Sequence, residues 1–412
     1  MLLLCICYSS RYKKSNNFYK LIHISMKMKI IFLLMLFAIS SSETNLVSAQ
    51  TSNRVVTTSK ADSSELITVT SPAYCSDVNG KTTIKFKAPG AKSANVKCWI
   101  QDATWGHDYI FPAVKLDAAS NGKFIFQADR FPHGPTCIRI SAGNDQCYLQ
   151  LYNTGGVSWK EGIPAPPPQA AGMSLAFQDD FSGPLSISST GVGKTYSSRH
   201  IDGSFGKLPF ADYESPKNPF SQRDTYLRIR ADVNKGSSGL ISTRRSDSTY
   251  SCAVKFGYFE CRFIAPMATG SWPAFWGCTA RGRTPATRYC DEIDVIEAYA
   301  NAPDKYEANW HIWEKKHTAS PKTESVLMTI LGGKSNWSTT SHIYGVLIKQ
   351  DSITYYCDNI KVWQHPTTPY CKTTPFYVMI NLAMGGGRRT FDLTRYNNIT
   401  DMYVDYLRVF QY

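Results

Sequence analysis

The chain has 412 residues, a formal net charge of +13 at pH 7, 13% aromatic residues and only 19% charged residues. This length allows two or three domains with sizeable cores. Helical periodicity is scarce, no Lys/Arg cluster is interleaved with aromatic residues on one element, and no apolar run is long enough for a permanent membrane span. We therefore exclude helical, nucleic-acid-binding and membrane-spanning proteins.

The N-terminus has the pattern of an export signal. Two lysines precede an apolar run at 30–39, and small residues at 47–49 fit a cleavage site. Residues 1–25 do not fit a signal, so the predicted signal peptide at 1–49 begins with an extension, and a later methionine is the alternative start. We expect a secreted protein, or one in the periplasm or at the cell surface.

The cysteines agree with export. Of the 12, two lie in the predicted signal region, and an even number remains in each half of the chain. This favours disulfides closed within each half, and we expect Cys278 to pair with Cys290. Zinc is disfavoured because no Cys-x-x-Cys pair occurs. The remaining cysteines are Cys75, Cys98, Cys137, Cys147, Cys252, Cys261, Cys278, Cys290, Cys357 and Cys371.

Composition divides the rest of the chain into a tail, two domains and a linker. Residues 50–64 are rich in Ser and Thr and are predicted to be disordered. Residues 65–159 predict an immunoglobulin-like β-sandwich. Residues 160–172 are rich in proline and predict a stiff, extended linker. Residues 173–412 have the length of one large β-sandwich. Strands of the first domain are expected at 66–70, 82–87, 94–100, 123–127, 137–141 and 147–152.

Two interpretations of the first domain stay open. Trp99, Trp105 and Tyr109 supply flat rings on which sugars stack, which favours a carbohydrate-binding module. The same rings equally fit a hydrophobic core, in which case the domain is a spacer. The basic charge of the chain either favours acidic or sulfated polysaccharides or an anionic cell surface, or only keeps the protein soluble.

The segment 292–297, Glu-Ile-Asp-Val-Ile-Glu, places three carboxylates within six residues. Side chains alternate along a strand, so Glu292 and Asp294 share a face and Glu297 has the opposite parity. A β-bulge of one residue after Asp294 brings Glu297 to the same face. Neighbouring like charges repel, so strand stability does not favour this pattern. We interpret it as an active-site strand rather than a charged strand facing solvent.

Two glutamates on a cleft face are what double-displacement glycoside hydrolysis requires. Side chains leaning toward each other from this strand bring the carboxyls of Glu292 and Glu297 to about 5–5.5 Å, the retaining separation, rather than the roughly 6.5–9.5 Å of inverting enzymes. Glu297 must start protonated, and burial beside two carboxylates raises its pKa. Asp294 lies between the two glutamates and holds Glu292 in position.

Aromatic residues flank this strand in the sequence. Trp272 and Trp276 share parity and are expected to stack on sugar rings in the cleft. His311 is expected near Glu297, where it hydrogen-bonds the acid or a sugar hydroxyl, and a buried structural histidine is the alternative. Trp313 has the same parity as His311 and is a further candidate for sugar binding.

Six motifs in a fixed order resemble family 16 of the glycoside hydrolases, which includes laminarinases, lichenases, agarases and carrageenases. Each motif alone is weak, but their order along the second domain indicates the family. They are FQDDFSG at 177–183, FGYFECR at 256–262 with GSWPAFW at 270–276, EIDVIE at 292–297, NWH at 309–311, YVMINLAMGG at 377–386 and MYVDYLRVF at 402–410.

The resemblance implies a jelly roll of two curved antiparallel sheets whose concave face is the substrate cleft. The spacing Glu-x-Asp-x-x-Glu is similar to the bulged, laminarinase- and agarase-like branch. By this resemblance Glu292 is the nucleophile, Asp294 its assisting partner and Glu297 the acid/base. Asp180 and Asp405 resemble positions that hold a structural calcium ion in some members, and the reaction itself requires no cofactor.

The chain departs from familiar laminarinases just before Glu292, where it has Arg-Tyr-Cys-Asp instead of a Trp-Pro and a Gly. Arg281, Arg283 and Arg288 near the cleft either recognise sulfate or carboxylate groups through forked hydrogen bonds or form a solvated loop. The departure affects the identity of the substrate and leaves the chemistry untouched.

We therefore predict a monomeric, secreted, retaining endo-β-glycan hydrolase whose partner is a polysaccharide, without nucleic-acid or membrane partners. β-1,3-Glucan or mixed-linkage glucan is the leading substrate. One alternative is hydrolysis of an agar- or carrageenan-type galactan, sulfated or not. A second is a non-catalytic glycan-binding protein on the same fold, which the intact acidic triplet disfavours. Transglycosylation differs only in whether sugar or water enters the intermediate.

Overall fold

The computed structural model describes residues 66–412 apart from several gaps. The predicted signal peptide, the segment 50–64, Trp105, the side chain of Trp99 and the three arginines at 281–288 lie outside the described residues. Residues Ala61–Tyr412 form one compact unit. The gaps are 101–106, 159–162, 201–202, 281–288, 301, 303, 315, 320–323, 328–340 and 387–389.

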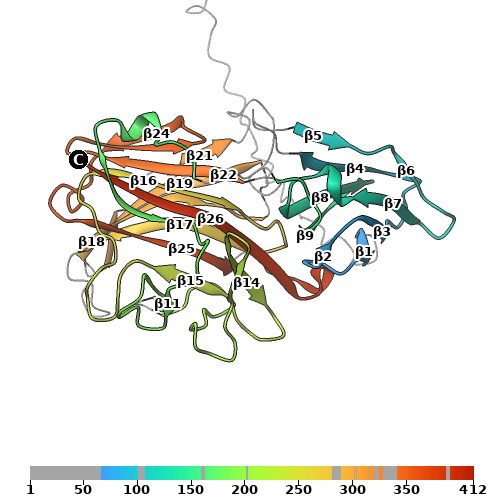
Figure 1. The fold of residues 1–412 in the computed structure, drawn as a ribbon, viewed down its shortest axis with the longest axis horizontal. Coiled ribbons are helices and arrows are strands. Elements are labelled where there is room, and N and C mark those ends of the chain that lie inside the picture. Colours follow the sequence, from blue (N-terminus) through green and yellow to red (C-terminus); the bar gives the residue numbers. More distant parts are fainter. Residues whose placement is uncertain are drawn as a thin grey trace, which may run out of the picture. The chain divides into compact units, whose positions relative to one another are not determined.

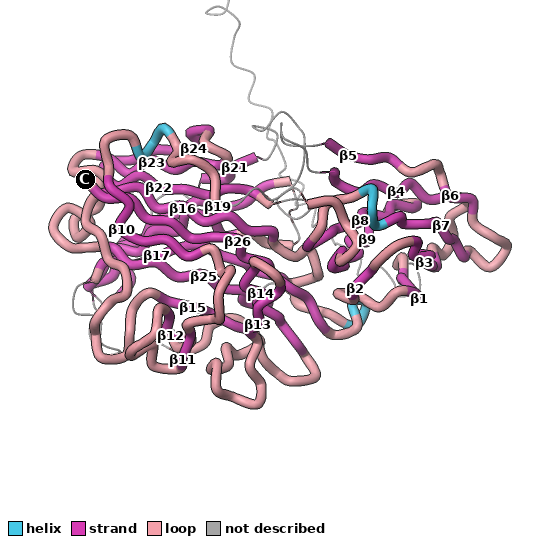
Figure 2. Tube along the Cα trace, viewed as in Figure 1, coloured by secondary structure: helices cyan, strands magenta, loops and turns pink. Residues whose placement is uncertain are grey.

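Strands make up nearly all of the regular structure, as Figures 1 and 2 show. Within the described residues the helical elements are short 3-10 segments at Ala128–Arg130, Pro168–Ala170 and Thr394–Tyr396. None of the helices in this part of the chain has the length and apolar character that crossing a membrane demands. The predicted all-β class is confirmed.

The first domain is a small sandwich of two sheets. Its strands are β1 (Thr68–Ser71), β2 (Asp77–Val78), β3 (Lys81–Lys87), β4 (Ser93–Ile100), β5 (His107–Ile110), β6 (Val114–Lys115), β7 (Asn121–Gln127), β8 (Gly134–Ala142) and β9 (Asp145–Asn153). One sheet has the order β1-β3-β7, and the other has the order β2-β9-β8-β4-β5 with β6 paired to β4. Alternate side chains of both sheets, such as Phe86, Val96 and Phe126, are buried in one core.

The second domain is a larger sandwich, and its first sheet contains the last strand of the chain. The strands of this sheet are β10 (Ser174–Asp179), β13 (Phe220–Arg223), β14 (Tyr226–Asp232), β16 (Gly257–Ile264), β22 (His342–Ile348), β23 (Ser352–Cys357), β24 (Ile360–Pro366) and β26 (Ile399–Gln411). They follow the antiparallel order β13-β14-β26-β16-β22-β23-β24, and β10 also pairs with β26. The long β26 is therefore central to this layer (Figure 1).

The second sheet of this sandwich carries the acidic strand. Its strands are β11 (Ile187–Ser188), β12 (Tyr196–Ser197), β15 (Gly239–Ser242), β17 (Ser271–Thr279), β18 (Tyr289–Glu297), β19 (Lys305–Glu314), β20 (Lys316–Ala319), β21 (Glu324–Leu327) and β25 (Phe376–Met384). The order is β11-β12-β15-β25-β17-β18-β19-β20, and β21 also pairs with β19. The predicted jelly-roll sandwich is confirmed.

Alternation along β17 and β25 decides which side chains reach the core between the sheets. Phe275, Val378 and Ile380 belong to this core. Trp276 and Met379 point to the opposite face, where they belong to a separate cluster. Because nearly every residue of these strands is buried, the opposite face is a sheltered surface rather than an open one.

The structure records no disulfide among the ten cysteines that it describes, all of which are buried, so the predicted pairing is not seen. Cys278 on β17 lies opposite Glu292 on β18, so Cys290 lies diagonally from it, two residues further along. Diagonal neighbours are about 7–8 Å apart, which exceeds the span of a disulfide. Burial raises the pKa of Cys137 to about 12 and that of Cys147 to about 11, so these thiols stay protonated.

The described part of the proline-rich linker packs on the second domain. Ala170 is buried in a cluster with Tyr258 and Phe410, and Nη1 of Arg408 donates to the carbonyl oxygen of Pro164 at 2.5 Å. The segment that was expected to be stiff and extended thus covers apolar surface of the second domain.

Candidate active site

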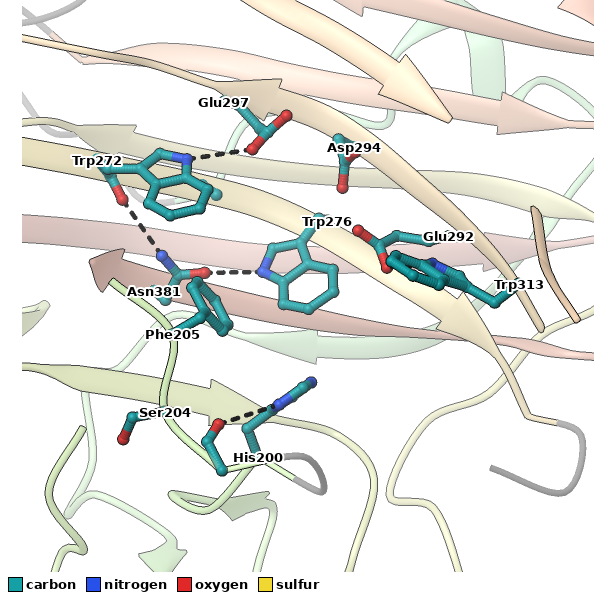
Figure 3. A pocket seen from close by; sticks show the side chains of 12 residues that line it. His200, Ser204, Phe205, Trp272, Trp276, Glu292, Asp294, Glu297, Trp313 and Asn381 are labelled. Carbon is teal, nitrogen blue, oxygen red and sulfur yellow. Dashed lines mark hydrogen bonds between the residues drawn. The ribbon is translucent and has the colours of Figure 1, made fainter. Parts of the chain in front are cut away.

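β18 contains the bulge that the sequence predicts. Asp294 and Glu297 are three positions apart on β18, whereas their partners on β17 are two positions apart, so Val295 is the extra residue. The pairing of β18 with β19 is irregular over the same stretch. The bulge brings Glu292, Asp294 and Glu297 to one face, where all three line the same cavity (Figure 3).

Glu297 is held by two donors on one of its oxygens. Oε1 accepts hydrogen bonds from Nε1 of Trp272 and from the hydroxyl of Tyr299, both at 3.1 Å. The rings of Trp272 and Tyr299 are stacked, with centroids 5.6 Å apart. Since Oε1 is occupied as an acceptor, Oε2 is the oxygen that carries a proton. The sequence analysis missed Tyr299, although it follows Glu297 by two residues.

Burial is the largest cause of a raised pKa at Glu297, which lies at about 8. Repulsion from Asp294 and Glu292 adds to the rise, whereas the hydrogen bond from Tyr299 and the influence of His311 oppose it. Glu297 is therefore mostly protonated at neutral pH. This is the starting state that a general acid requires.

Trp313 on β19 orients Glu292. Its Nε1 donates to Oε2 of Glu292 at 2.8 Å, and its side chain lines the same cavity. The sequence analysis assigned Trp313 to sugar binding and did not foresee this bond. Within the described residues no hydrogen bond to Oε1 of Glu292 is recorded, and the side chain lines the cavity.

The structure places His311 in contact with Asp294, whereas the sequence analysis expected it near Glu297. Its Nε2 lies 3.3 Å from Oδ2 of Asp294 and 3.1 Å from Nδ2 of Asn309. In the register of β18 and β19, His311 lies opposite Glu292 and Asn309 lies opposite Asp294, so His311 reaches Asp294 along the diagonal. Burial, together with repulsion from Glu292, raises the pKa of Asp294 well above its usual range. His311 is not among the residues that line the cavity, and its recorded ion-pair contact with the three acids is with Asp294.

Trp272 and Trp276 both line the cavity. Trp276 is only 6% exposed, and its Nε1 donates to Oδ1 of Asn381 on β25 at 2.7 Å. Nδ2 of Asn381 in turn donates to the carbonyl oxygen of Trp272 at 3.3 Å. Asn381 thus ties the two tryptophans together, and Trp276 is a wall of the cavity more than an open stacking platform.

A loop between β12 and β13 supplies the rest of the lining, with His200, Ser204 and Phe205 (Figure 3). The ring of Phe205 packs against Trp272 and Trp276 at centroid distances of 5.4 and 5.8 Å. The cavity has a volume of about 360 Å³. The sequence analysis missed this loop, because no motif or periodicity marks it.

Metal binding finds little support at the predicted positions. Asp405 forms an ion pair with Arg262, and Oδ1 of Asp180 accepts hydrogen bonds from the backbone and hydroxyl of Ser182. Neither aspartate belongs to the clusters of three metal-binding side chains found among the described residues. Those clusters are Glu292 with Asp294 and His311, and His342 with Cys357 and Asp358. A structural calcium ion stays a prediction.

A β-sandwich that displays two glutamates and an aspartate on one strand, in a cavity walled by tryptophans, has the site of a glycoside hydrolase. The model of glycosyl hydrolases family 16 matches residues 212–408, which include all three acids. This match covers just under half of the chain and agrees with the resemblance that the motifs carry.

Curated relatives share only parts of their length with the chain. Endo-1,3-1,4-beta-glycanase EglC of Rhizobium meliloti is 32% identical over 177 residues, which are 41% of this chain and 35% of that protein. Glucan endo-1,3-beta-glucosidase A1 of Niallia circulans is 26% identical over 279 residues, which are 59% of this chain and 39% of that protein. The chain thus spans little more than a third of these relatives.

Solved structures with a similar course of the chain include a laminarinase from Flavobacterium sp. UMI-01. It has 23% sequence identity and a TM-score of 0.46, and the match covers 58% of this chain and 100% of that one. The laminarinase catalytic domain from Thermotoga maritima MSB8 has 19% identity and a TM-score of 0.46, and the match covers 58% of this chain and 98% of that one.

Proposed function

We propose that the chain is a secreted, retaining endo-β-glycan hydrolase that cleaves β-1,3- or mixed-linkage β-glucan by double displacement. The observation that carries the proposal is the pair of glutamates on one cavity face. Glu297 is protonated and accepts a hydrogen bond from the indole N–H of Trp272. Glu292 is held for attack by the indole N–H of Trp313. The names of the two curated relatives support the substrate, and the predicted signal peptide supports secretion.

In the first step, Oε1 of Glu292 attacks the anomeric carbon and forms a glycosyl ester as the glycosidic bond breaks. The leaving oxygen takes the proton from Oε2 of Glu297. Burial favours the neutral form of Asp294, which removes a like charge beside the attacking carboxylate of Glu292.

In the second step, the carboxylate of Glu297 takes a proton from a water molecule that attacks the same carbon, and the ester bond to Glu292 breaks. The two inversions together retain the β configuration. While Glu297 is ionised, the donors Trp272 and Tyr299 stabilise its charge. General acid–base assistance of this kind contributes about 10²–10⁴-fold to the rate.

The substrate is tested by incubating the full chain with laminarin, lichenan, agarose and carrageenan and measuring reducing ends. We expect release from laminarin and lichenan, with a β anomer as the first product by NMR. Release from the galactans alone would establish the alternative substrate. A first-formed α anomer would refute retention. No release, combined with retention on insoluble glycan, would establish a non-catalytic binding protein.

The nucleophile is tested with Glu292→Gln, which keeps an oxygen acceptor for Trp313. We expect kcat to fall by about 10⁴-fold or more while the melting temperature stays close to that of the parent. Glu314→Gln, at the exposed end of β19, is the matched control and should keep full activity. A fully active Glu292→Gln variant would refute the assignment.

A further inference from the structure

The outer face of the three-stranded sheet in the first domain is strongly basic. Alternation along β3 exposes Lys81, Lys85 and Lys87, and Lys123 is exposed in the same way on the neighbouring β7. The exposed positions of β1, β3 and β7 contain no carboxylate. In the described part of the chain, none of these lysines forms an ion pair.

The register of this sheet places two of the cations together. Lys85 lies directly opposite Lys123, and directly opposed like charges destabilise a sheet. Lysine on an edge strand prevents pairing with other chains, which explains Lys123 on β7. Edge protection does not explain the lysines of β3, because β3 is the central strand. The repulsion instead points to a ligand that neutralises these charges.

A hollow of about 880 Å³ extends from this face along β7. Its lining combines Lys85, Lys115 and Lys123 with the aromatic rings of Phe111 and Phe124. The two rings pack against each other at a centroid distance of 5.1 Å. The hollow therefore offers both cations and apolar surface.

Asp117 also lines the hollow, but it is engaged within its own turn. Its Oδ1 accepts hydrogen bonds of 2.9 Å from the backbone N–H groups of Ala119 and Asn121, and its carboxylate accepts two more from the side-chain amide of Asn121. Its charge is committed to this turn rather than to the lysines.

We propose that this lysine face and hollow bind an acidic polysaccharide. Such a polymer alternates anionic groups with the apolar CH faces of its rings. Lys85 and Lys87 are two residues apart on β3, a spacing of about 7 Å, and Lys81 lies four residues from Lys85, so the three form a row along which an extended polyanion lies. Phe124 has the opposite parity to Lys123 on β7, so Phe111 and Phe124 offer apolar surface to sugar rings inside the hollow, beside the lysine face, and Lys115 adds charge at the border. The choice of a polysaccharide over other polyanions rests on the proposed function.

Binding is measured by affinity electrophoresis of the full chain carrying Glu292→Gln, so that hydrolysis does not interfere. The probes are alginate, which carries carboxylates, and dextran sulfate, with dextran as the neutral control. We expect retardation by at least one acidic polymer and none by dextran. Lys85→Gln with Lys123→Gln should lower the affinity by about fivefold or more. This variant should melt no earlier than its parent, because it relieves repulsion.

The matched control removes the same charge elsewhere, through Lys235→Gln with Lys372→Gln at exposed sites of the second domain. We expect its affinity to stay within about twofold of the parent, because distant surface charges are screened. Equal losses in both double variants, or no binding to either acidic polymer, would overturn the proposal. Tighter binding of a DNA duplex or of phosphatidylserine vesicles through Lys85 and Lys123 would also overturn it.

Hydrolysis of laminarin is assayed in parallel with the wild-type chain and with Lys85→Gln/Lys123→Gln in a chain that keeps Glu292, and this double variant should hydrolyse laminarin normally. Absence of hydrolysis with lysine-dependent binding intact would refute the proposed function alone. Normal hydrolysis without binding would refute the lysine face alone.

Discussion

Trp272 on β17 donates its indole N–H to Oε1 of Glu297 on the neighbouring β18. Tyr299 donates to the same oxygen, and both donors favour the ionised carboxylate. Burial disfavours the ionised form and outweighs the two hydrogen bonds, since the pKa of Glu297 still rises to about 8. Glu297 thus holds a proton at neutral pH and has partners ready to stabilise it after the proton leaves.

Removing the hydroxyl of Tyr299 should move the alkaline limb of the activity profile to higher pH. The hydrogen bond from Tyr299 lowers the pKa of Glu297, so Tyr299→Phe raises that pKa further, while the phenyl ring keeps its stack on Trp272. The measurement is kcat/KM across the alkaline range. Tyr356→Phe on β23, in the other sheet, is the control. An unchanged alkaline limb would contradict a role for Tyr299 in tuning the acid.

Trp313→Phe should lower kcat/KM by about 10–100-fold. The change removes the N–H that holds Oε2 of Glu292, and a hydrogen bond to a charged group contributes about 1.5–3 kcal/mol. We expect the loss mainly in kcat, because the bond positions the attacking carboxylate. Trp363→Phe on β24 tests whether any loss of an indole has this effect. A loss confined to KM would contradict this positioning role and would support the predicted role of Trp313 in sugar binding.

Glu297→Gln should stabilise the protein at alkaline pH. The pKa of Glu297 rises from 4.5 to about 8 on folding, so the folded state binds this proton more tightly than the unfolded state. The resulting stability is complete below about pH 4.5 and is lost as the pH rises through about 8. The variant should therefore melt several degrees above the wild type beyond pH 8 and close to it at acidic pH. Thermal unfolding at both pH values checks this, and an equal difference at both would contradict the raised pKa.

Asn381→Leu should both destabilise the fold and weaken substrate binding. Asn381 is fully buried and is the acceptor for Nε1 of Trp276. Leaving that donor buried without a partner costs about 1–3 kcal/mol, and each kcal/mol lowers the melting temperature of a domain this size by about 2–4 °C. KM should rise, because the cavity wall formed by Trp272 and Trp276 loses the hydrogen bonds through which Asn381 links the two residues. Asn234→Ala at an exposed turn is the control, and an unchanged melting temperature and KM in Asn381→Leu would contradict this role.

Much of the fold follows from local sequence patterns. The strands expected at 82–87, 94–100, 123–127, 137–141 and 147–152 all occur within β3, β4, β7, β8 and β9. Alternation of apolar and polar residues between turn residues is a property of each segment alone, so it is visible without the fold. The bulge in β18 was predictable for the same reason, because three acids reach one face only if a residue is inserted.

The contacts of each carboxylate were not predictable in this way. Parity placed Trp313 and His311 on one face of β19, but the register of β19 against β18 decided that Trp313 reaches Glu292 and that His311 reaches Asp294. The loop that carries Phe205 had no signal at all, because it contributes through packing and not through periodicity.

The amino-acid sequence by itself determined the strands, the acidic face of β18 and the family 16 motifs, because each depends on residues close together along the chain. Only the tertiary structure decided which donor each acid receives, that Cys278 and Cys290 stay apart, and that lysines from β3 and β7 gather beside one hollow. These features depend on the pairing of distant strands, and pairing is set by the packing of the whole sheet.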